Sequence, residues 1–347
     1  MPVIDRLLPG DRAAVITLYR RVFGGDLADA NDLRWDWQYA RNPNNPSQGP
    51  QIWVAREGPA IVGQYATMPV RLWVRNQEVD ASWGMDVMVA PERQRQGLGE
   101  LLFHTWDAHV GASLGLGLSD SSSRLFRKLR WPTPGPVPCL VKPLSRRAFR
   151  RANWPTAVNR LVSAATLPVV KFVSRVRPLR VEVAVTREFG DGFTRLWDRV
   201  APKFDFAVKR DAPYLHWKYL LPPHVRYLVA VAGGPDDPRG YVVYRHVVEP
   251  RGRVTLLVDF LCDPDDEATF VTLLGWVDRE ARSNDSDKIR GFAMHAGFRH
   301  LLKRSGYFEV KSTMEFVAKV NAATVPEAFY RKTDRWHVTL GDSDQDR

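Results

Sequence analysis

The residues best suited to chemistry lie in the run 89–99, which reads Val-Ala-Pro-Glu-Arg-Gln-Arg-Gln-Gly-Leu-Gly. An apolar segment precedes this run and an amphipathic one follows it, so the pattern predicts a turn between a strand and a helix. The first amides of a helix lack intrahelical partners and carry the positive end of the helix dipole. Gly97 and Gly99 let a ligand approach the backbone closely, and Arg93 and Arg95 add positive charge. The run therefore predicts an anion site suited to a pyrophosphate.

A carboxylate, Asp86, stands just before this run between the apolar residues Met85 and Val87. Burial on a strand raises the pKa of a carboxylate and makes it a better proton acceptor, so Asp86 could act as a general base. Asp259 occupies the matching place in a second, similar stretch of the chain, which suits a structural hydrogen-bond acceptor instead. Both roles stay open for Asp86. Weaker candidates for the base are Glu78, Asp36 and Glu57.

The anion site resembles the acetyl-CoA motif of the GNAT superfamily of N-acetyltransferases. That motif is Gln/Arg-x-x-Gly-x-Gly/Ala after a strand ending in Val-x-Pro, and the residues from Gln94 to Gly99 fit it. Downstream, residues 124–131 read Arg-Leu-Phe-Arg-Lys-Leu-Arg-Trp and are similar to the closing Leu-Tyr-x-Lys-Leu-Gly-Phe of the family. The resemblance covers about residues 1–138. Neither the Rossmann pattern nor the P-loop pattern is present.

The resemblance implies that acetyl-CoA is the acyl-donor cosubstrate. Backbone groups of Met88 and Val89 are then expected to hold the pantetheine arm, and Ser122, in the loop after the next strand, to line the far side of the cofactor. The amides expected to hold the pyrophosphate belong to Gln94, Arg95, Gln96, Gly97, Leu98 and Gly99.

The resemblance also implies a general acid, since a Tyr near the closing helix often has that role in this family. The matching residue is Phe126, which has no proton to give. The remaining candidates for the acid are Tyr65, Ser122 and His104.

These residues need a layered fold to position them. The apolar periodicity predicts two helices, then strands, then helix, strand and helix, which is an α/β (α+β) domain with a mixed central sheet flanked by helices. The predicted strands are 51–56, 60–69, 70–75, 78–89 and 114–118, and the predicted helices are 11–23, 33–39, 97–110 and 121–129.

The order of elements recurs in the second half of the chain, which predicts two tandem GNAT-like domains. The matched segments are 33–39 with 213–219, 52–55 with 228–231, 86–91 with 259–264, and 124–128 with 300–304. A tandem duplication explains them, and two unrelated αβ domains with generic patterns are the alternative. The predicted division is a GNAT domain at 1–139, a basic helical linker at 140–180 and a degenerate GNAT-like domain at 181–347.

The second copy lacks the glycine pair. In place of the loop 94–99 it has Asp-Asp-Glu-Ala-Thr at 265–269, and three carboxylates at a helix start would repel a pyrophosphate. The second domain is therefore not expected to bind CoA.

Charge is unevenly distributed along the chain of 347 residues, whose formal net charge is +11. Segment 140–180 contains no acidic residue and holds the basic residues Lys142, Arg146, Arg147, Arg150, Arg151, Arg160, Lys171, Arg175, Arg177 and Arg180. Such a segment could contact a membrane surface or an acyl carrier protein. Nucleic acid is not an expected partner, because no recognition helix, zinc finger or RNA-binding signature accompanies the charge.

The sequence also lacks the patterns expected of a metal site, a signal peptide or a membrane-spanning helix. Cys139 and Cys262 lie far apart and the histidines show no ligand spacing, so no metal is predicted. The sequence has no signal-peptide pattern and no run of about 18 uncharged apolar residues, so a cytoplasmic location is expected. The oligomeric state does not follow from the sequence.

The predicted activity is transfer of an acetyl group from acetyl-CoA to a primary amine of a small molecule, such as an amino sugar or amino acid. One alternative is a longer-chain acyltransferase that uses acyl-CoA or acyl carrier protein. Another is a non-catalytic CoA-binding sensor or scaffold, which Phe126 at the acid position would suit. Five tryptophans could line an acceptor pocket or pack in the core: Trp35, Trp37, Trp53, Trp73 and Trp83.

Overall fold

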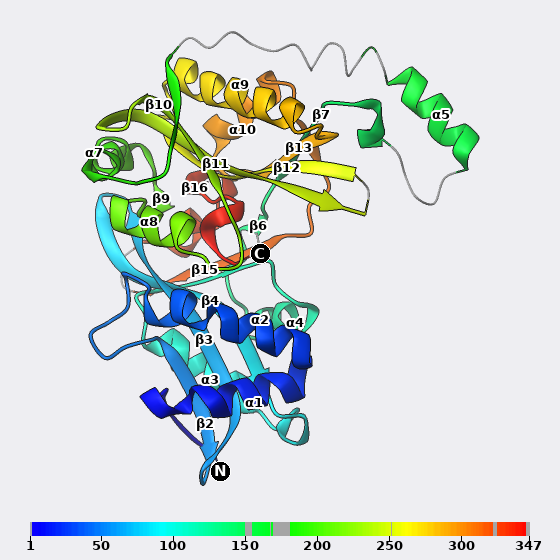
Figure 1. Ribbon diagram of the computed structural model, residues 1–347. Helices are drawn as coiled ribbons and strands as arrows, with labels where there is room; N and C mark the ends of the chain where they lie inside the picture. The colour runs from blue at the N-terminus through cyan, green and yellow to red at the C-terminus, as the bar shows by residue number, and fades with distance from the viewer. Residues whose placement is uncertain are drawn as a thin grey trace.

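The computed structural model describes residues 2–149, 155–166, 168, 181–250, 252–321 and 325–344. Two mixed β-sheets lie one above the other, and each carries helices of its own (Figure 1). The N-terminus lies at the far end of the first sheet, whereas the C-terminal end of the chain lies near the boundary between the two sheets. The α/β fold class predicted from the sequence is confirmed.

The first sheet has the strand order β1-β2-β3-β4-β5-β15-β6, and β9 pairs with both β3 and β16. The strands are β1 (Val3–Arg6), β2 (Ile52–Glu57), β3 (Ala60–Val74), β4 (Gln77–Val89), β5 (Ala112–Leu116), β15 (Glu315–Val320), β6 (Gly135–Pro136), β9 (Phe206–Val208) and β16 (Trp336–His337). The two strands predicted at 60–69 and 70–75 form the single long strand β3.

The second sheet has the order β14-β7-β13-β12-β11-β10-β8. Its strands are β14 (Phe308–Val310), β7 (Cys139–Pro143), β13 (Lys288–Phe292), β12 (Gly252–Cys262), β11 (Asp237–Glu249), β10 (Leu228–Gly234) and β8 (Val183–Thr186). In the first sheet β4 pairs in parallel with β5, and β9 with β16, whereas in the second sheet the parallel pair is β12 with β13.

Helices cover these sheets through apolar faces at helical spacing. They are α1 (Arg12–Phe23), α2 (Gly25–Trp35), α3 (Leu98–Ala108), α4 (Asp120–Lys128), α7 (Asp191–Val200), α8 (Ala212–Leu220), α9 (Glu267–Ser283), α10 (Ala296–Arg304) and α11 (Glu327–Tyr330). A further helix, α5 (Thr156–Ala165), lies away from both sheets (Figure 1). In α3, for example, Leu98, Leu102 and Trp106 recur every four residues and are buried. The helix predicted at 33–39 is the end of α2 followed by a π-helical turn, Asp36–Ala40.

The two sheets exchange strands. β7, which follows β6 of the first sheet directly, lies in the second sheet between β14 and β13. β15, which follows β14 of the second sheet, returns to the first sheet between β5 and β6. Lys142 of β7 is buried and forms an ion pair with Asp278 of α9, so it is part of a core and not of a solvated basic linker. The predicted limits of the domains stay a prediction.

The segments matched by the sequence occupy corresponding places in the two sheets. Segment 52–55 lies in β2 and segment 228–231 in β10, while 86–91 and 259–264 lie at the ends of β4 and β12. The order of helices around them also agrees, since α3 follows β4 and α9 follows β12. This correspondence is what the predicted tandem duplication requires, and the duplication itself stays a prediction.

The five tryptophans singled out from the sequence are distributed over two hydrophobic clusters. Trp35 and Trp53 pack in the smaller cluster beneath α1 and α3, whereas Trp37 and Trp83 belong to the larger one that extends into the second sheet. Trp73 packs against the larger cluster and is only partly buried. They therefore belong to separate clusters, and core packing accounts for their burial.

Candidate active site

The first sheet opens between β4 and β5. The two strands pair in parallel only where Ala81–Trp83 of β4 lie beside Ala112–Leu114 of β5, and the described strands share no further pairs. Beyond these pairs, residues 84–89 continue along β3 while β5 runs beside β15. We call this opening the splay. One helix begins beyond each arm of it, α3 after β4 and α4 after β5.

The turn between β4 and α3 is shaped by its own side chains. The Gln94 Nε2 donates to the carbonyl of Val89 at 3.1 Å, and the Gln96 Nε2 donates to the carbonyl of Glu92 at 2.9 Å. The backbone bends into the left-handed region at Arg95, with φ 61°, and at Gly97, with φ 82°. Glycine adopts that conformation without strain, which explains its place at the N-cap of α3.

This turn leaves backbone donors available. Among the described residues, the amides of Arg95, Gln96 and Gly97 have no backbone acceptor, and α3 has no side-chain cap. The first amides of a helix add further unpaired donors. A Cβ atom on Gly99 would meet only the Val89 side chain, at 3.8 Å. Successive amides at an uncapped helix start form a concave anion site, so these residues fit a pyrophosphate.

The two arginines of the turn differ in whether a carboxylate already neutralises their charge. Arg93 forms an ion pair with Glu57 at 2.6 Å, so it is already occupied. Arg95 is exposed, and within the described ranges it has no carboxylate partner. Arg95 is therefore the side chain of the loop best placed to meet an anion.

The remaining predicted cofactor residues flank the splay. Met88 and Leu98 are buried and Val89 is partly buried, at the end of β4 and the start of α3. Ser122 lies in the first turn of α4, on the β5 side, where its backbone N–H donates to the Ser119 Oγ at 3.2 Å. The structure thus brings the loop 94–99 and Ser122 to opposite arms of the same splay.

Asp86 lies in a β-bulge of β4, since Tyr65 of β3 pairs with Val87 but Thr67 pairs with Gly84. Its carboxylate is buried beneath α1 and α2 and accepts hydrogen bonds from three neutral side chains. The donors are the hydroxyl of Tyr39 at 2.6 Å, the Nδ2 of Asn31 at 3.0 Å and the hydroxyl of Tyr19 at 3.2 Å. Burial, and then the charge of Asp86, raise the pKa of Tyr39 well above its ordinary value, so this phenol stays a donor.

Sequence reasoning missed Tyr19, Asn31 and Tyr39. The available signal was a polar residue on an otherwise apolar helix face, because Tyr19 follows Val15 and Leu18 on the buried side of α1. Nothing in the local pattern indicated which strand residue these side chains would contact.

The matching residue in the second sheet, Asp259, has a different set of partners. It forms an ion pair with the buried Arg210 at 3.2 Å and accepts hydrogen bonds from Tyr241 at 3.0 Å and Thr339 at 2.9 Å. Burial opposes the charge of Arg210, but Asp259 and Asp342 outweigh it and raise the pKa of the guanidinium. Asp259 is therefore part of a buried structural network in which Arg210 pairs with two carboxylates, those of Asp259 and Asp342.

The helix start in the second sheet is also closed by its own sequence. The Asp266 carboxylate accepts from the backbone N–H of Thr269 at 3.0 Å and from its hydroxyl at 2.7 Å. A carboxylate thus occupies the amides at the start of α9, at the place where α3 leaves them open.

The candidates for the acid occupy different environments. Tyr65 is buried, and its hydroxyl reaches Gly84, where a Cβ would lie only 2.6 Å from it. Gly84 directly follows the last paired residue of β4, so this hydroxyl lies where the splay begins. Burial, then Asp107, raise the pKa of Tyr65 well above its ordinary value. His104 is exposed on α3, 3.9 Å from Glu100.

Phe126 points into the core. Its ring packs against Phe103, at a centroid distance of 5.0 Å, and against Trp131, at 4.9 Å. The weaker candidates for the base are each engaged in an ion pair with an arginine or lysine: Asp36 with Arg12, Glu57 with Arg93, and Glu78 with Lys209.

The described ranges also bear on metal binding, on membrane-spanning helices and on the predicted linker. No group of three or more His, Cys, Asp and Glu side chains there could hold a metal ion. Within the same ranges, every helix is too short or too polar to cross a membrane. Part of the predicted linker is the helix α5, but Arg150, Arg151, Lys171, Arg175, Arg177 and Arg180 lie outside the described residues.

A splayed mixed sheet with an open helix start fits the class of acyl-CoA-dependent acyltransferases. Residues 4–112 match the acetyltransferase (GNAT) domain family. This N-terminal segment is therefore a GNAT acetyltransferase domain, which makes the chain an acyltransferase of a fold family that binds acyl-CoA. No functionally curated protein matches the chain.

Solved structures resemble nearly the whole chain. A GCN5-related N-acetyltransferase from Anabaena variabilis is 14% identical with a TM-score of 0.63, covering 92% of this chain and 73% of that one. A probable N-acyltransferase from Enterococcus faecalis is 13% identical with a TM-score of 0.62, covering 93% and 73%. N-myristoyltransferase of Saccharomyces cerevisiae, solved with bound myristoyl-CoA, is 11% identical with a TM-score of 0.55, covering 91% and 82%. At these identities the likeness is one of fold.

Proposed function

We propose that the protein transfers an acetyl group from acetyl-CoA to a primary amine of a small molecule. The observation that carries this proposal is the set of open backbone amides from Arg95 to Gly97, at an uncapped helix start beside the splay. Such donors suit the pyrophosphate of CoA, and the family match supports an acyl-CoA donor.

The site residues follow from this placement of the donor. The loop from Gln94 to Gly99 holds the pyrophosphate, and backbone groups of Met88 and Val89 hold the pantetheine arm along β4. Ser122 lines the other side of the arm. A donor extended in this way runs from the start of α3 toward Asp86, which puts the thioester near the beginning of the splay.

Acyl transfer requires two proton movements. The amine nitrogen must be neutral when it attacks the thioester carbonyl, and the carbon–sulfur bond then breaks to release the CoA thiolate. We propose that Asp86 accepts the proton of the amine, directly or through a water. Its hydrogen bonds to Tyr19, Asn31 and Tyr39 fix the orientation of the carboxylate for that role.

The thiolate needs a donor, for which Tyr65 is better placed than the other candidates. Its hydroxyl lies beside Gly84 at the beginning of the splay, whereas Phe126 is packed among aromatic rings and His104 is exposed. A phenol with a raised pKa remains protonated at neutral pH and stabilises a developing thiolate by hydrogen bonding.

The second domain is proposed to be non-catalytic. Asp266 occupies the start of α9, and Arg210 neutralises the carboxylate that corresponds to Asp86. At these places the second domain therefore lacks both the open amides that would hold an acyl-CoA donor and a carboxylate, held by neutral side chains, that would accept a proton from the amine. The second domain instead contributes the strands β9, β15 and β16 to the first sheet.

The proposal is tested by the release of free thiol from acetyl-CoA with a panel of amines. We expect thiol release that depends on both substrates, with acetylated amine as the product. Binding of acetyl-CoA without turnover of any amine would contradict the proposed activity and favour a sensor or scaffold.

A longer acyl chain is the second candidate, favoured by the likeness to N-myristoyltransferase. A series of acyl-CoA donors from two to fourteen carbons distinguishes the two. A kcat/KM that is highest for acetyl-CoA supports the first proposal, and one that rises with chain length supports the second.

A further inference from the structure

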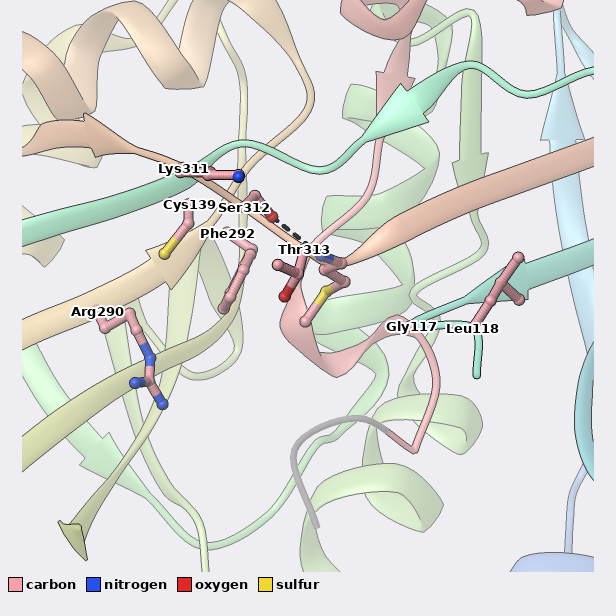
Figure 2. A pocket seen from close by; sticks show the side chains of 9 residues that line it. Gly117, Leu118, Cys139, Arg290, Phe292, Lys311, Ser312 and Thr313 are labelled. Carbon is pink, nitrogen blue, oxygen red and sulfur yellow. Dashed lines mark hydrogen bonds between the residues drawn. The ribbon is translucent and has the colours of Figure 1, made fainter. Parts of the chain in front are cut away.

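A pocket of about 420 Å³ lies where the chain crosses between the two sheets (Figure 2). Its walls come from the end of β5, from β7 and β13 of the second sheet, and from the segment that leads back into β15. The lining residues are Gly117, Leu118, Cys139, Arg290, Phe292, Lys311, Ser312, Thr313 and Met314. The strand exchange creates this pocket, because both crossing segments contribute to it. Its size lies within the range of small-molecule sites.

The polar groups of the pocket are mainly donors. Lys311 is exposed and forms no ion pair with any described residue. The Ser312 Oγ accepts a hydrogen bond from the Met314 backbone N–H at 3.2 Å, which leaves its own proton to donate. Thr313 adds a second exposed hydroxyl on the same segment, next to Lys311 and Ser312 (Figure 2).

The charge of the pocket is positive. Arg290 is held by Glu249 through two hydrogen bonds, at 2.6 and 3.2 Å, so its charge is largely balanced. Lys311 supplies an unbalanced positive charge, and the lining contains no carboxylate. A site with one free cation, two hydroxyl donors and no acidic side chain favours an anion over a neutral or cationic ligand.

The register of the first sheet relates this pocket to the proposed active site. Trp83 of β4 pairs with Leu114 of β5, and the strands diverge from that point. Asp86 lies three residues beyond Trp83, and Gly117 lies three residues beyond Leu114. The pocket therefore begins on the β5 arm at about the level at which Asp86 stands on the β4 arm.

We propose that this pocket binds a carboxylate or phosphate group of the acyl acceptor, so that the preferred acceptors are amines that also carry an anionic group. The inference rests on the proposed function, because it assumes an acceptor whose amine reaches the splay. It narrows the acceptor class to acidic amines, such as amino acids or phosphorylated amines, and away from neutral amino sugars.

The first test measures anion binding without turnover. Titration of the protein with inorganic phosphate is followed by the shift in melting temperature, for the unaltered chain and for Lys311→Glu. We expect a saturable rise in the unaltered protein that Lys311→Glu reduces, and the part that remains comes from the open amides of the loop 94–99. The matched control is Lys303→Glu on α10, a residue outside the pocket that pairs with Glu309. An equal response of all three proteins would overturn the proposal.

The second test compares matched acceptors in the transfer reaction, 6-aminohexanoate and its uncharged amide. We expect Lys311→Gln to raise the KM for the acid by about five- to tenfold, as for loss of one exposed charge-assisted contact, and to leave the KM for the amide unchanged. The kcat with the acid should change little, because Lys311 positions the acceptor and does not touch the reacting atoms.

The outcomes distinguish an anionic group of the acceptor from a phosphate of acetyl-CoA. They also distinguish failure of the anion pocket from failure of the proposed acetyl transfer. If Lys311→Gln raises the KM for acetyl-CoA and not that for the acid, the pocket serves a phosphate of the donor and the inference is wrong. If phosphate binding depends on Lys311 but no amine is acetylated, the proposed function fails while the anion pocket stands. If turnover is normal and acid and amide respond alike, the inference fails while the proposed function stands.

Discussion

Trp37 and Trp217 bind to each other by a reciprocal pair of hydrogen bonds. The indole Nε1 of Trp37 donates to the backbone carbonyl of Trp217 at 2.8 Å, and the Nε1 of Trp217 donates to the carbonyl of Trp37 at 2.7 Å. Their rings stack with centroids 5.4 Å apart. Since the two residues hold the same place in the matched segments, the contact has the form of an isologous interface between the two halves of one chain.

The first prediction concerns this pair. Trp37→Phe and Trp217→Phe each leave one buried carbonyl without its donor, so we expect each to lower the free energy of unfolding by about 1–3 kcal/mol. Urea unfolding measures the effect. Because the two tryptophans are in contact, the loss in the double variant should differ from the sum of the two single losses. Strict additivity would contradict the coupling inferred from the geometry.

The second prediction concerns the donor loop. Gly99→Val places a branched side chain where the structure leaves only Val89 nearby, so the fold should tolerate it while the approach of a ligand to the backbone is blocked. We expect calorimetry to give about one CoA per unaltered chain and no measurable binding for the variant. Gly25→Ala, at an open glycine far from the loop in sequence, is the control. A stoichiometry of two would mean that the second domain also binds CoA.

The third prediction concerns Asp86. If it acts as the base, Asp86→Asn should lower kcat by at least about 100-fold, with CoA affinity little changed, and the pH–rate profile should lose its acidic limb. Tyr39→Phe removes one hydrogen bond but retains the carboxylate, so it should lower kcat less and preserve the limb. A near-normal rate and profile for Asp86→Asn would show that this residue, like Asp259, is structural.

The fourth prediction concerns stability at mildly acidic pH. Burial, and then the charge of Arg210, lower the pKa of His337 well below its ordinary value, and burial also lowers the pKa of His295. Below about pH 6.5 the unfolded chain binds protons that the folded one does not, so stability should fall as the pH decreases from 7.5 to 5.5.

The loss expected from one such histidine approaches about 1.4 kcal/mol per pH unit below the unfolded pKa. Urea unfolding at pH 7.5, 6.5 and 5.5 measures it. In His337→Gln, which retains an N–H donor for the carbonyl of Phe260, the slope should be reduced. An unchanged slope in that variant would indicate that other groups carry the acid sensitivity.

The sequence by itself determined the local parts of the site. The strand, turn and helix start around residues 89–99 follow from apolar periodicity and from Gly97, whose left-handed φ of 82° depends on little beyond its neighbours. The carboxylates at 265–269 likewise predicted a different helix start in the second half, and Asp266 caps that helix. Such features involve residues a few positions apart, so their physical causes are present in the local sequence.

Only the tertiary structure decided which distant residues meet. The partners of Asp86 come from α1, α2 and the following turn, 67, 55 and 47 positions away. The contact between Trp37 and Trp217 spans 180 positions, and the one that ties Ser123 to Glu315 spans 192. Periodicity reports which face of an element is buried but not against what, so the strand exchange, and the pocket around Lys311 that it creates, could not be read from it.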